Sequence, residues 1–294
     1  MRITLLGTGT PGPSLARQSS GYLVDVGDDV LVLDHGPGAH HRLLESGRRA
    51  VEVTHAFFTH LHYDHCLDYA RLVLQRWDQG ADRIPELDVY GPAPIARMTS
   101  QLFGEDGVYG PDIRARVEHQ SSLDVFQARG GSLPRRRPEP RVTEVHAGSV
   151  IDGRGWKMRV GHAAHVQPQL ECLAYRIDSD AGSICYSGDS GFCQELVELA
   201  RGCDILVQMN HHFSGTEPSL AYRAACGNHE DNARLARDAG VKTLVLTHLL
   251  PQIDQPGVRE QIVHEIRRVF DGRVIWGEDL MRLQIDDNLK FDIS

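Results

Sequence analysis

Short apolar runs along the chain predict strands, and apolar residues spaced three or four apart predict helices. The helical spacing is clear from Leu67 to Trp77. Asn228 is suited to cap a helix over residues 229–239, and Gly240 to end it. The other predicted helices cover residues 39–45, 94–103, 192–201 and 258–270. The predicted strands cover residues 3–6, 22–26, 30–33, 53–58, 87–90, 142–145, 156–160, 172–177, 183–186, 204–207, 241–246 and 281–285, with one more near Val274.

The predicted strands come in two batches, each accompanied by helices. No linker or break in composition separates the batches. Because a sheet must bury its apolar face on another layer, we expect an α/β (α+β) fold in which two sheets pack face to face with helices outside. The chain is expected to form one domain over residues 1–294, a size at which α/β enzymes often have a single domain.

Residues 104–141 fit this pattern least well. The stretch is less regular through Val125, and a glycine pair with three prolines predicts an exposed loop over 127–141. We therefore interpret residues 104–141 as an insertion or exposed loop region. The loop contains Arg135, Arg136 and Arg137. Such a run is usually a solvated surface, although it can also contact phosphates.

Composition and charge narrow the class of protein. A hydrophobic content of 41% and a charged content of 24% are ordinary for a soluble globular protein. The formal net charge of −9 gives no general attraction to nucleic acid. The six cysteines are scattered without a C-x-x-C pair, which indicates reduced thiols. The chain enters a strand at once and shows no signal-peptide pattern, so we expect a cytoplasmic protein without a membrane span.

A dense group of possible metal ligands follows the apolar stretch 53–58. His60, His62, Asp64 and His65 form an H-x-H-x-D-H pattern. Three imidazoles and a carboxylate suit zinc or a similar cation. Because side chains alternate along a strand, all four cannot converge on one ion, and we expect them to serve two ions. The alternative is a polar turn in a chain that has 16 histidines.

Further candidate ligands occur just after other predicted strands. His162 and His165 follow one strand, Asp189 a second and His248 a third. Strand ends are where a sheet fold collects catalytic groups from distant parts of the sequence. The small residues beside Asp189 leave room for two ions to approach one carboxylate. A lone histidine at such a position is more often structural, but the number and placement here favour ligands.

Two other motif matches do not carry their usual function. Gly7 to Gly12 reads G-x-G-x-x-G after a strand, but Pro11, Pro13 and polar residues replace the helix that a dinucleotide needs. Gly188-Asp189-Ser190-Gly191 matches the nucleophile loop of serine proteases only as a short word.

Taken together, the motifs resemble those of the metallo-β-lactamase superfamily of zinc hydrolases, in the branch of ribonuclease Z and related phosphodiesterases. The resemblance covers nearly the whole chain and implies a four-layer αββα sandwich with both metals at one edge. The histidine cluster is its most specific part. The matching motifs are Leu5-Leu6-Gly7-Thr8-Gly9, Arg17-Gln18-Ser19-Ser20, Asp34-His35-Gly36-Pro37-Gly38, His60 to His65, Gly188-Asp189-Ser190 and Thr247-His248.

The family pattern implies a ligand set for each ion. Matched position by position, it assigns His60, His62 and His165 to one metal. Asp64, His65 and His248 are assigned to the other metal, with Asp189 as the bridge. His165 is preferred to His162 because it lies nearer the strand 173–177, which resembles the Gly-Tyr-Arg strand of relatives.

This site predicts a dinuclear zinc hydrolase, with Mn²⁺ or Fe²⁺ as alternative metals. Two zinc ions that share a carboxylate also share a water, whose pKa falls from about 15.7 to near 7, so that metal-bound hydroxide is available as nucleophile. The leading hypothesis for the substrate is a small molecule with an ester, phosphodiester or related bond. Hydrolytic dehalogenase, lactonase or β-lactamase-like activity on the same site is a further alternative.

The rival hypothesis is a transfer RNA 3′ endonuclease of the ribonuclease Z type, with the loop from Arg135 to Arg137 as its RNA contact. Against it, Gln208 and Met209 stand where those enzymes carry a histidine and a glutamate. The sequence also shows no convincing equivalent of their glycine-rich protruding arm, although residues 104–141 are long enough to contain a variant of it. His229 matches a second histidine of those enzymes, and it is interpreted either as catalytic or as structural. Asp64, the other predicted catalytic residue, acts as a metal ligand in this scheme.

A third class, a non-catalytic scaffold, is disfavoured because all seven expected ligands are present. The family resemblance also makes a homodimer the expected assembly. The sequence itself does not reveal the oligomeric state.

Overall fold

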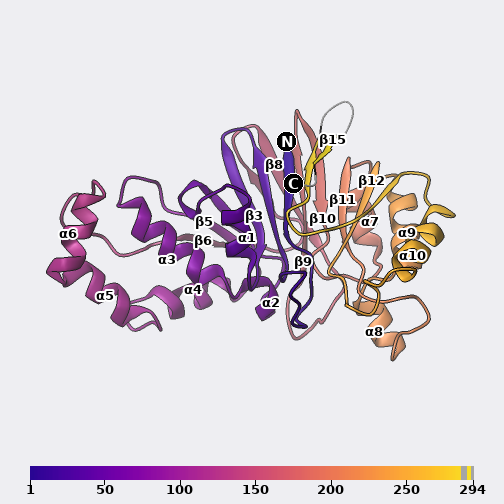
Figure 1. Ribbon diagram of the computed structural model, residues 1–294, viewed down its shortest axis with the longest axis horizontal. Helices are drawn as coiled ribbons and strands as arrows, with labels where there is room; N and C mark the ends of the chain where they lie inside the picture. Colours follow the sequence, from indigo (N-terminus) through magenta and orange to yellow (C-terminus); the bar gives the residue numbers. More distant parts are fainter. Residues whose placement is uncertain (286–289, 293–294) are drawn as a thin grey trace.

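The computed structural model describes residues 1–285 and 290–292. Its strands form two mixed sheets that face each other in the middle of the molecule, with helices on both outer sides (Figure 1). This is the αββα arrangement that the sequence predicted.

The first sheet contains the amino-terminal strands. Antiparallel pairing joins β14, β1, β2 and β3, and parallel pairing joins β3, β4, β5 and β6. In spatial order the strands are β15 (Lys290–Asp292), β14 (Arg282–Gln284), β1 (Arg2–Gly7), β2 (Gly21–Val26), β3 (Asp29–His35), β4 (His55–Phe57), β5 (Asp88–Gly91) and β6 (Arg141–Glu144).

The second sheet is built by the later part of the chain. Its strands β10 to β13 pair in parallel and β7 to β10 pair antiparallel. In spatial order they are β13 (Arg273–Trp276), β12 (Thr243–Thr247), β11 (Ile205–Met209), β10 (Gly182–Tyr186), β9 (Leu173–Ser179), β8 (Trp156–His162) and β7 (Val150–Asp152).

Each outer face of the sandwich is covered by helices. The first sheet carries α1 (Ala39–Glu45), the 3₁₀ turn η1 (Ala50–Glu52), α2 (Tyr63–Cys66), α3 (Tyr69–Gly80) and α4 (Ile95–Phe103). The second sheet carries α7 (Gln194–Ala200), α9 (His229–Ala239) and α10 (Val258–Arg267), and α8 (Leu220–Ala225) lies in a loop beside them. Within the described residues, no helix combines the length and apolar character needed to cross a bilayer.

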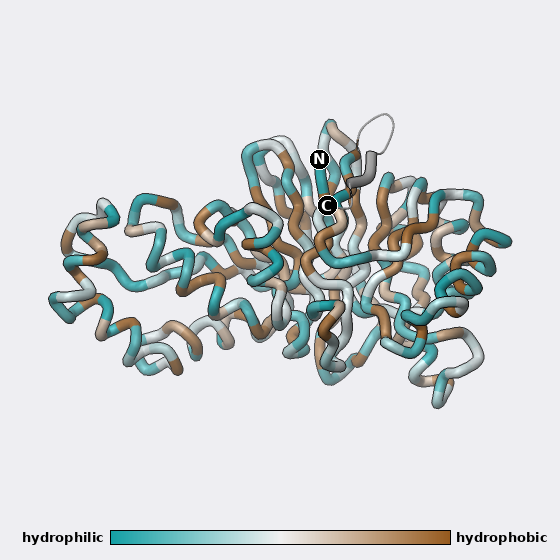
Figure 2. The backbone as a smooth tube through the Cα atoms, viewed as in Figure 1, coloured by the Kyte–Doolittle hydropathy of each residue, from teal (hydrophilic) through white to brown (hydrophobic). Residues whose placement is uncertain are grey.

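Three apolar cores hold these layers together. The central core joins residues of both sheets, such as Leu5 and Leu33 with Tyr175 and Val207. The other two lie between each sheet and its helices. Apolar residues accordingly concentrate along the strands in the middle of the molecule (Figure 2).

Residues 104–141, interpreted from the sequence as an insertion or exposed loop region, contain helices. Residues 110–128 form two helices, α5 (Gly110–Glu118) and α6 (Gln120–Ala128), which extend away from α3 (Figure 1). We call residues 104–137 the arm. Pro111 near the start of α5 and a single buried residue in α6, Phe126, left these helices without a strong apolar stripe to predict them from.

The arginine run is not a free surface either. Arg135 is 7% exposed, and its guanidinium lies 2.8 Å from Asp78 and over the ring of Trp77. Arg137 donates to the carbonyl oxygens of Phe103 and Gly104. Two of the three arginines therefore fasten the arm to the body, and only Arg136 is mainly exposed.

Candidate metal centre

All candidate ligands follow strands, and the two sheets bring these strand ends to one edge. The cluster from His60 to His65 follows β4 of the first sheet and runs into α2, which lies at the lower edge of the molecule in Figure 1. His165, Asp189 and His248 follow β8, β10 and β12 of the second sheet. Strands of different sheets thus supply one site.

The side chains fall into two groups. His60, His62, His165 and Asp189 offer one ligand atom each, and these atoms all lie within 4.8 Å of one another. Asp64, His65 and His248 form a second group within the same limit. The division matches the two ligand sets that the family pattern implies.

Asp189 lies between the two groups. Its Oδ1 is 3.3 Å from His65 Nε2, and its Oδ2 is 3.2 Å from His248 Nε2 and 3.7 Å from His165 Nε2. Gly188, with φ of +57°, precedes it, and a Cβ there would approach Thr59 to 2.7 Å. Glycine at 188 therefore lets the chain turn and pass close to the first sheet.

Unpartnered buried atoms show that the residues fit a cation. His65 Nε2 and Asp189 Oδ1 are both buried and have no hydrogen-bond partner. A buried polar atom without a partner costs free energy, and native proteins rarely leave one. Two such atoms that face each other across 3.3 Å are accounted for by a metal ion between their groups.

The outer ring nitrogens of the histidines are held by acceptors. His65 Nδ1 lies 2.8 Å from Asp34, and His165 Nδ1 lies 2.8 Å from the carbonyl oxygen of Ala225. His60 Nδ1 lies 3.0 Å from the hydroxyl of Thr59. With Nδ1 engaged in this way, each ring presents Nε2 to the centre, as a ligating histidine requires.

Burial and charge shape the electrostatics of the centre. Burial and the neighbouring His65 lower the pKa of His60 well below its ordinary value, which favours the neutral imidazole that binds metals. Burial opposes charge on His65, but Asp189 and Asp34 outweigh it and raise the pKa of His65. Burial likewise opposes ionisation of Asp189, but His248 and His65 hold its pKa well below the ordinary range. Positive charge close to Asp189 is therefore favourable.

Asp34, which the sequence offered only as part of the motif from Asp34 to Gly38, contacts a residue of the centre. Its wholly buried carboxylate accepts hydrogen bonds from the backbone N–H and hydroxyl of Thr59 and from the hydroxyl of Tyr186, besides contacting His65. Asp34 therefore fixes the orientation of His65 relative to β4 and β10. The available signal in the sequence was an aspartate directly after the apolar run 30–33.

The two remaining histidine candidates lie elsewhere. His162 ends β8 and pairs with Leu173 of β9, outside both ligand groups. His229 begins α9, where Nδ1 accepts from the backbone N–H of Ser214 and Nε2 lies 2.6 Å from Glu265. Within the described residues, His229 belongs to neither of the two ligand groups. Its geometry is that of a residue that fixes α9 to α10.

Gln208 and Met209, which depart from the family pattern, are both buried in β11. Gln208 donates to the carbonyl oxygen of Ser190. In their neighbourhood His211 contacts the outer nitrogen of His248 at 3.0 Å. Burial and the adjacent His248 lower the pKa of His211 to about 4, so His211 is neutral at pH 7. The signal for His211 in the sequence is the His211-His212 pair shortly after an apolar strand.

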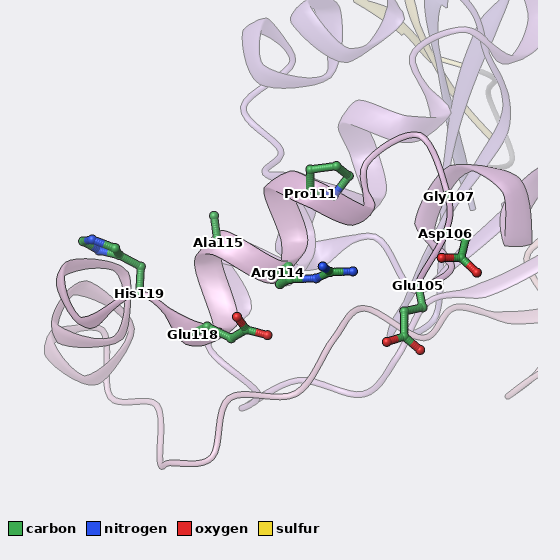
Figure 3. A pocket seen from close by; sticks show the side chains of 8 residues that line it. All are labelled: Glu105, Asp106, Gly107, Pro111, Arg114, Ala115, Glu118 and His119. Carbon is green, nitrogen blue, oxygen red and sulfur yellow. The ribbon is translucent and has the colours of Figure 1, made fainter.

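A surface cavity of about 690 Å³ lies away from this centre, on the arm. Its walls belong to α5 and the adjoining turns (Figure 3). They carry three carboxylates, one guanidinium and one imidazole, and share no residue with the two ligand groups. The lining residues are Glu105, Asp106, Gly107, Pro111, Arg114, Ala115, Glu118 and His119.

Comparison with known proteins agrees with this geometry. A family model described as a beta-lactamase superfamily domain matches residues 22–249, a span that contains all seven residues of the two ligand groups. The chain is 31% identical over 292 residues to a protein named Ribonuclease Z from Mycobacterium bovis (strain BCG / Pasteur 1173P2), covering 97% of this chain and 98% of that protein.

Solved structures share the fold at lower identity. The metallo-beta-lactamase fold protein YhfI from Bacillus subtilis superimposes with a TM-score of 0.72 at 18% identity, covering 96% of this chain and 98% of the other. The short form of human tRNase Z (ELAC1) gives a TM-score of 0.68 at 19% identity, covering 97% and 100%.

Proposed function

The chain belongs to the metallo-β-lactamase superfamily, on its ribonuclease Z-like branch, and is a metal-dependent hydrolase; we propose that it hydrolyses an ester, phosphodiester or related bond of a small molecule. The observation that carries this proposal is the pair of ligand groups joined by Asp189. The two groups offer ligand atoms for two cations on either side of this carboxylate.

In the proposed site, His60, His62 and His165 would hold one cation, and Asp64, His65 and His248 would hold the other. Asp189 would be shared between them. When bound, divalent ions lower the pKa of a coordinated water and polarise the acceptor oxygen of the substrate. Zinc suits these ligands best, with Mn²⁺ and Fe²⁺ as alternatives.

The surrounding residues orient these ligands. Asp34 contacts His65 Nδ1. The Thr59 hydroxyl donates to Asp34 and lies 3.0 Å from His60 Nδ1, so it connects His60 to the same carboxylate. Asp64 is buried and lies 3.3 Å from His248 Nε2, so we assign it as a ligand rather than a free base. His229, whose ring nitrogens contact Ser214 and Glu265, is assigned to support α9.

The charges of the loops around the centre support a small substrate. These loops, residues 8–20, 60–68, 162–172, 187–193, 210–228 and 248–257, contain two arginines and no lysine. Arg17 is buried and paired with Asp254 and Glu278, and Arg223 is paired with Glu217, Glu230 and Asp231. Binding to nucleic acid depends on several cationic side chains that are free to contact phosphates. Neither arginine is free in this sense.

The arm gives the same indication. In its arginine run, Arg135 pairs with Asp78, and Arg137 donates to backbone carbonyl oxygens. The cavity on the arm is lined by more carboxylates than basic groups. An RNA-gripping arm is expected to present a cluster of cationic side chains that are free to contact phosphates.

Transfer RNA processing is the second candidate function because the relatives at about 31% identity over nearly the whole chain bear the name Ribonuclease Z. A cytoplasmic location and a homodimer belong to the proposal as well, and light scattering on the purified protein tests the assembly.

The proposal is tested by a panel assay with metal-loaded protein. Its substrates are bis(p-nitrophenyl) phosphate, simple esters, lactones, a β-lactam and an activated aryl halide. We expect hydrolysis of at least one ester or phosphodiester, and a rate roughly 100-fold or more lower in His65→Ala. Equal activity in that variant excludes the proposed centre.

Precursor transfer RNA is assayed beside the panel. Cleavage by micromolar or less protein, weakened by added salt and by Arg114→Ala with Arg136→Ala, would establish the RNA candidate instead. These two arginines are the right probes because both are exposed, whereas replacing Arg135 also disturbs the fold of the arm.

A further inference from the structure

His248 is held differently from His60, His65 and His165. The outer nitrogens of His60, His65 and His165 contact oxygen atoms, whereas Nδ1 of His248 lies 3.0 Å from Nδ1 of His211. The two rings are inclined by 38° with centroids 5.0 Å apart. A contact between two ring nitrogens requires one donor and one acceptor.

The surroundings of His248 decide which ring donates. Its Nε2 faces Asp64 Oδ2 at 3.3 Å and Asp189 Oδ2 at 3.2 Å, the side on which a cation is proposed. A ligating Nε2 carries no proton, so Nδ1 carries it and donates to His211 Nδ1. His211 then accepts at Nδ1 and keeps its own proton on Nε2.

His211 is fixed well enough to act as such an acceptor. Its backbone N–H donates to the carbonyl oxygen of Gly227 at 2.7 Å, and the adjacent His212 forms a β-bridge with Asn228. The ring of Tyr222 packs beside the His211 ring, with centroids 6.0 Å apart. The position of Nδ1 is therefore set by backbone contacts and by packing.

The same segment also reaches the other ligand group. Residues 211–227 begin at His211 and include Ala225, whose carbonyl oxygen accepts from His165 Nδ1 at 2.8 Å. One loop thus supplies the outer acceptor for a histidine in each group. The loop can therefore fix the positions of these two histidines relative to each other.

We propose that His211 is a positioning residue, which fixes the tautomer and orientation of His248 by accepting a hydrogen bond from its Nδ1–H. The inference rests on the proposed function, in which His248 binds a cation through Nε2. His211 takes this role at the end of β11, next to the positions where Gln208 and Met209 replace the histidine and glutamate of the family pattern.

The test separates the hydrogen bond from the shape of the side chain. His211→Asn keeps an acceptor, because the amide oxygen can occupy the place of Nδ1, whereas His211→Leu fills similar volume without one. His264→Leu, at an exposed histidine of α10, is the control. Zinc affinity and stoichiometry are measured by competition with a chromophoric chelator, and far-UV circular dichroism of the metal-free proteins confirms folding.

We expect two zinc ions in the wild-type protein and in the control. In His211→Leu, one of the two sites should bind zinc about 10- to 100-fold more weakly, the usual effect of removing an outer partner of a ligand. His211→Asn should recover most of that loss. If His211→Leu does not fold, His211→Phe is the second variant without an acceptor.

The outcomes distinguish this inference from the function on which it rests. Two wild-type sites that are unchanged in the Leu variant overturn the role of His211 and leave the hydrolase proposal intact. Equal weakening in the Leu and Asn variants shows that the imidazole shape matters rather than the acceptor, and also overturns it. Less than one zinc per wild-type chain overturns the proposed function together with the inference.

Discussion

Asp34 shows how much one buried residue contributes to the centre. Its φ of +54° is unusual for a residue other than glycine. Three donors besides His65 saturate its carboxylate, from Thr59 and Tyr186. The strained backbone and the full set of partners are consistent with a residue whose position is set by its contact to His65.

Replacing Asp34 with asparagine should weaken metal binding while leaving all seven proposed ligands in place. The amide is nearly the same shape, but it is neutral and turns an NH₂ group toward groups that now donate to a carboxylate. We expect about a 10- to 100-fold loss of metal affinity, measured by chelator competition.

The matched control is Asp28→Asn, in the exposed turn between β2 and β3. Metal affinity in Asp34→Asn equal to that of the control would show that Asp34 serves the fold and not the centre.

At the scale of elements, local capping signals predicted some boundaries accurately. Helix α9 runs over the predicted residues because the Asn228 side chain accepts from the backbone N–H of Asp231 and Gly240 adopts φ of +63°. Helix α1 also matches the predicted span. The short helix α8 was not predicted, and no residue in it is buried. Ser219 caps α8 by accepting from the backbone N–H of Tyr222, but a cap without an apolar face on the helix was too weak a signal to predict it.

The arm depends on tertiary contacts. Asp78 of α3 lies within 2.6 Å of Arg129, 2.8 Å of Arg135 and 3.3 Å of Arg116. The three arginines belong to α5 and to the segment after α6, so one carboxylate joins separate parts of the arm to the body. Arg135 also lies over the rings of Trp77 and Phe126.

Asp78→Asn should therefore loosen the arm without affecting the metal centre. Removing the carboxylate leaves the buried Arg135 without a charged partner, at a cost of about 1–3 kcal/mol. We expect faster hydrogen exchange in residues 104–137, measured by mass spectrometry, with hydrolytic activity changed by less than about threefold.

The control is Asp112→Asn, because the Asp112 side chain is 48% exposed and pairs with Arg116 alone. If hydrogen exchange of residues 104–137 is unchanged in Asp78→Asn, Asp78 does not hold the arm to the body.

Acid should have the same effect on the arm as Asp78→Asn. Burial opposes ionisation of Asp78, but Arg135 and Arg129 outweigh it and lower the pKa of Asp78. A lowered folded-state pKa contributes stability above the unfolded value of about 3.9, and that contribution is lost as pH falls through the folded value. Exchange of the arm in the wild-type protein should thus rise below about pH 4 and approach that of Asp78→Asn.

At the scale of the whole molecule, the proposed cation sites join the two sheets. His60, His62, Asp64 and His65 extend from the first sheet, whereas the other three proposed ligands extend from the second. The interface between the sheets is otherwise the central apolar core. Metal binding should therefore stabilise the whole sandwich and not just one loop.

Added zinc should raise the thermal stability of the metal-free protein. Free metal at 100 times its Kd stabilises the folded state by about 2.7 kcal/mol, which corresponds to a Tm higher by several degrees. Differential scanning calorimetry measures the shift. Asp189→Asn should show a much smaller shift, and a shift as large as that of the wild type would place the bound metal elsewhere.

The sequence by itself determined the class of fold, most element positions and the set of candidate ligands. These depend on local properties: the apolar period, helix caps and the spacing of histidines and aspartates. The structure then brought His165 rather than His162 together with His60 and His62.

Only the tertiary structure decided how distant residues meet. It placed Asp34 behind His65, His211 behind His248, and Arg135 in a buried contact with Asp78. None of these pairs is close in sequence, and each arises because two sheets and their helices pack on shared apolar cores. The H-x-H-x-D-H motif alone specifies which atoms can bind a cation. The orientation of those atoms depends on side chains such as Asp34 and His211, which tertiary packing brings next to the ligands.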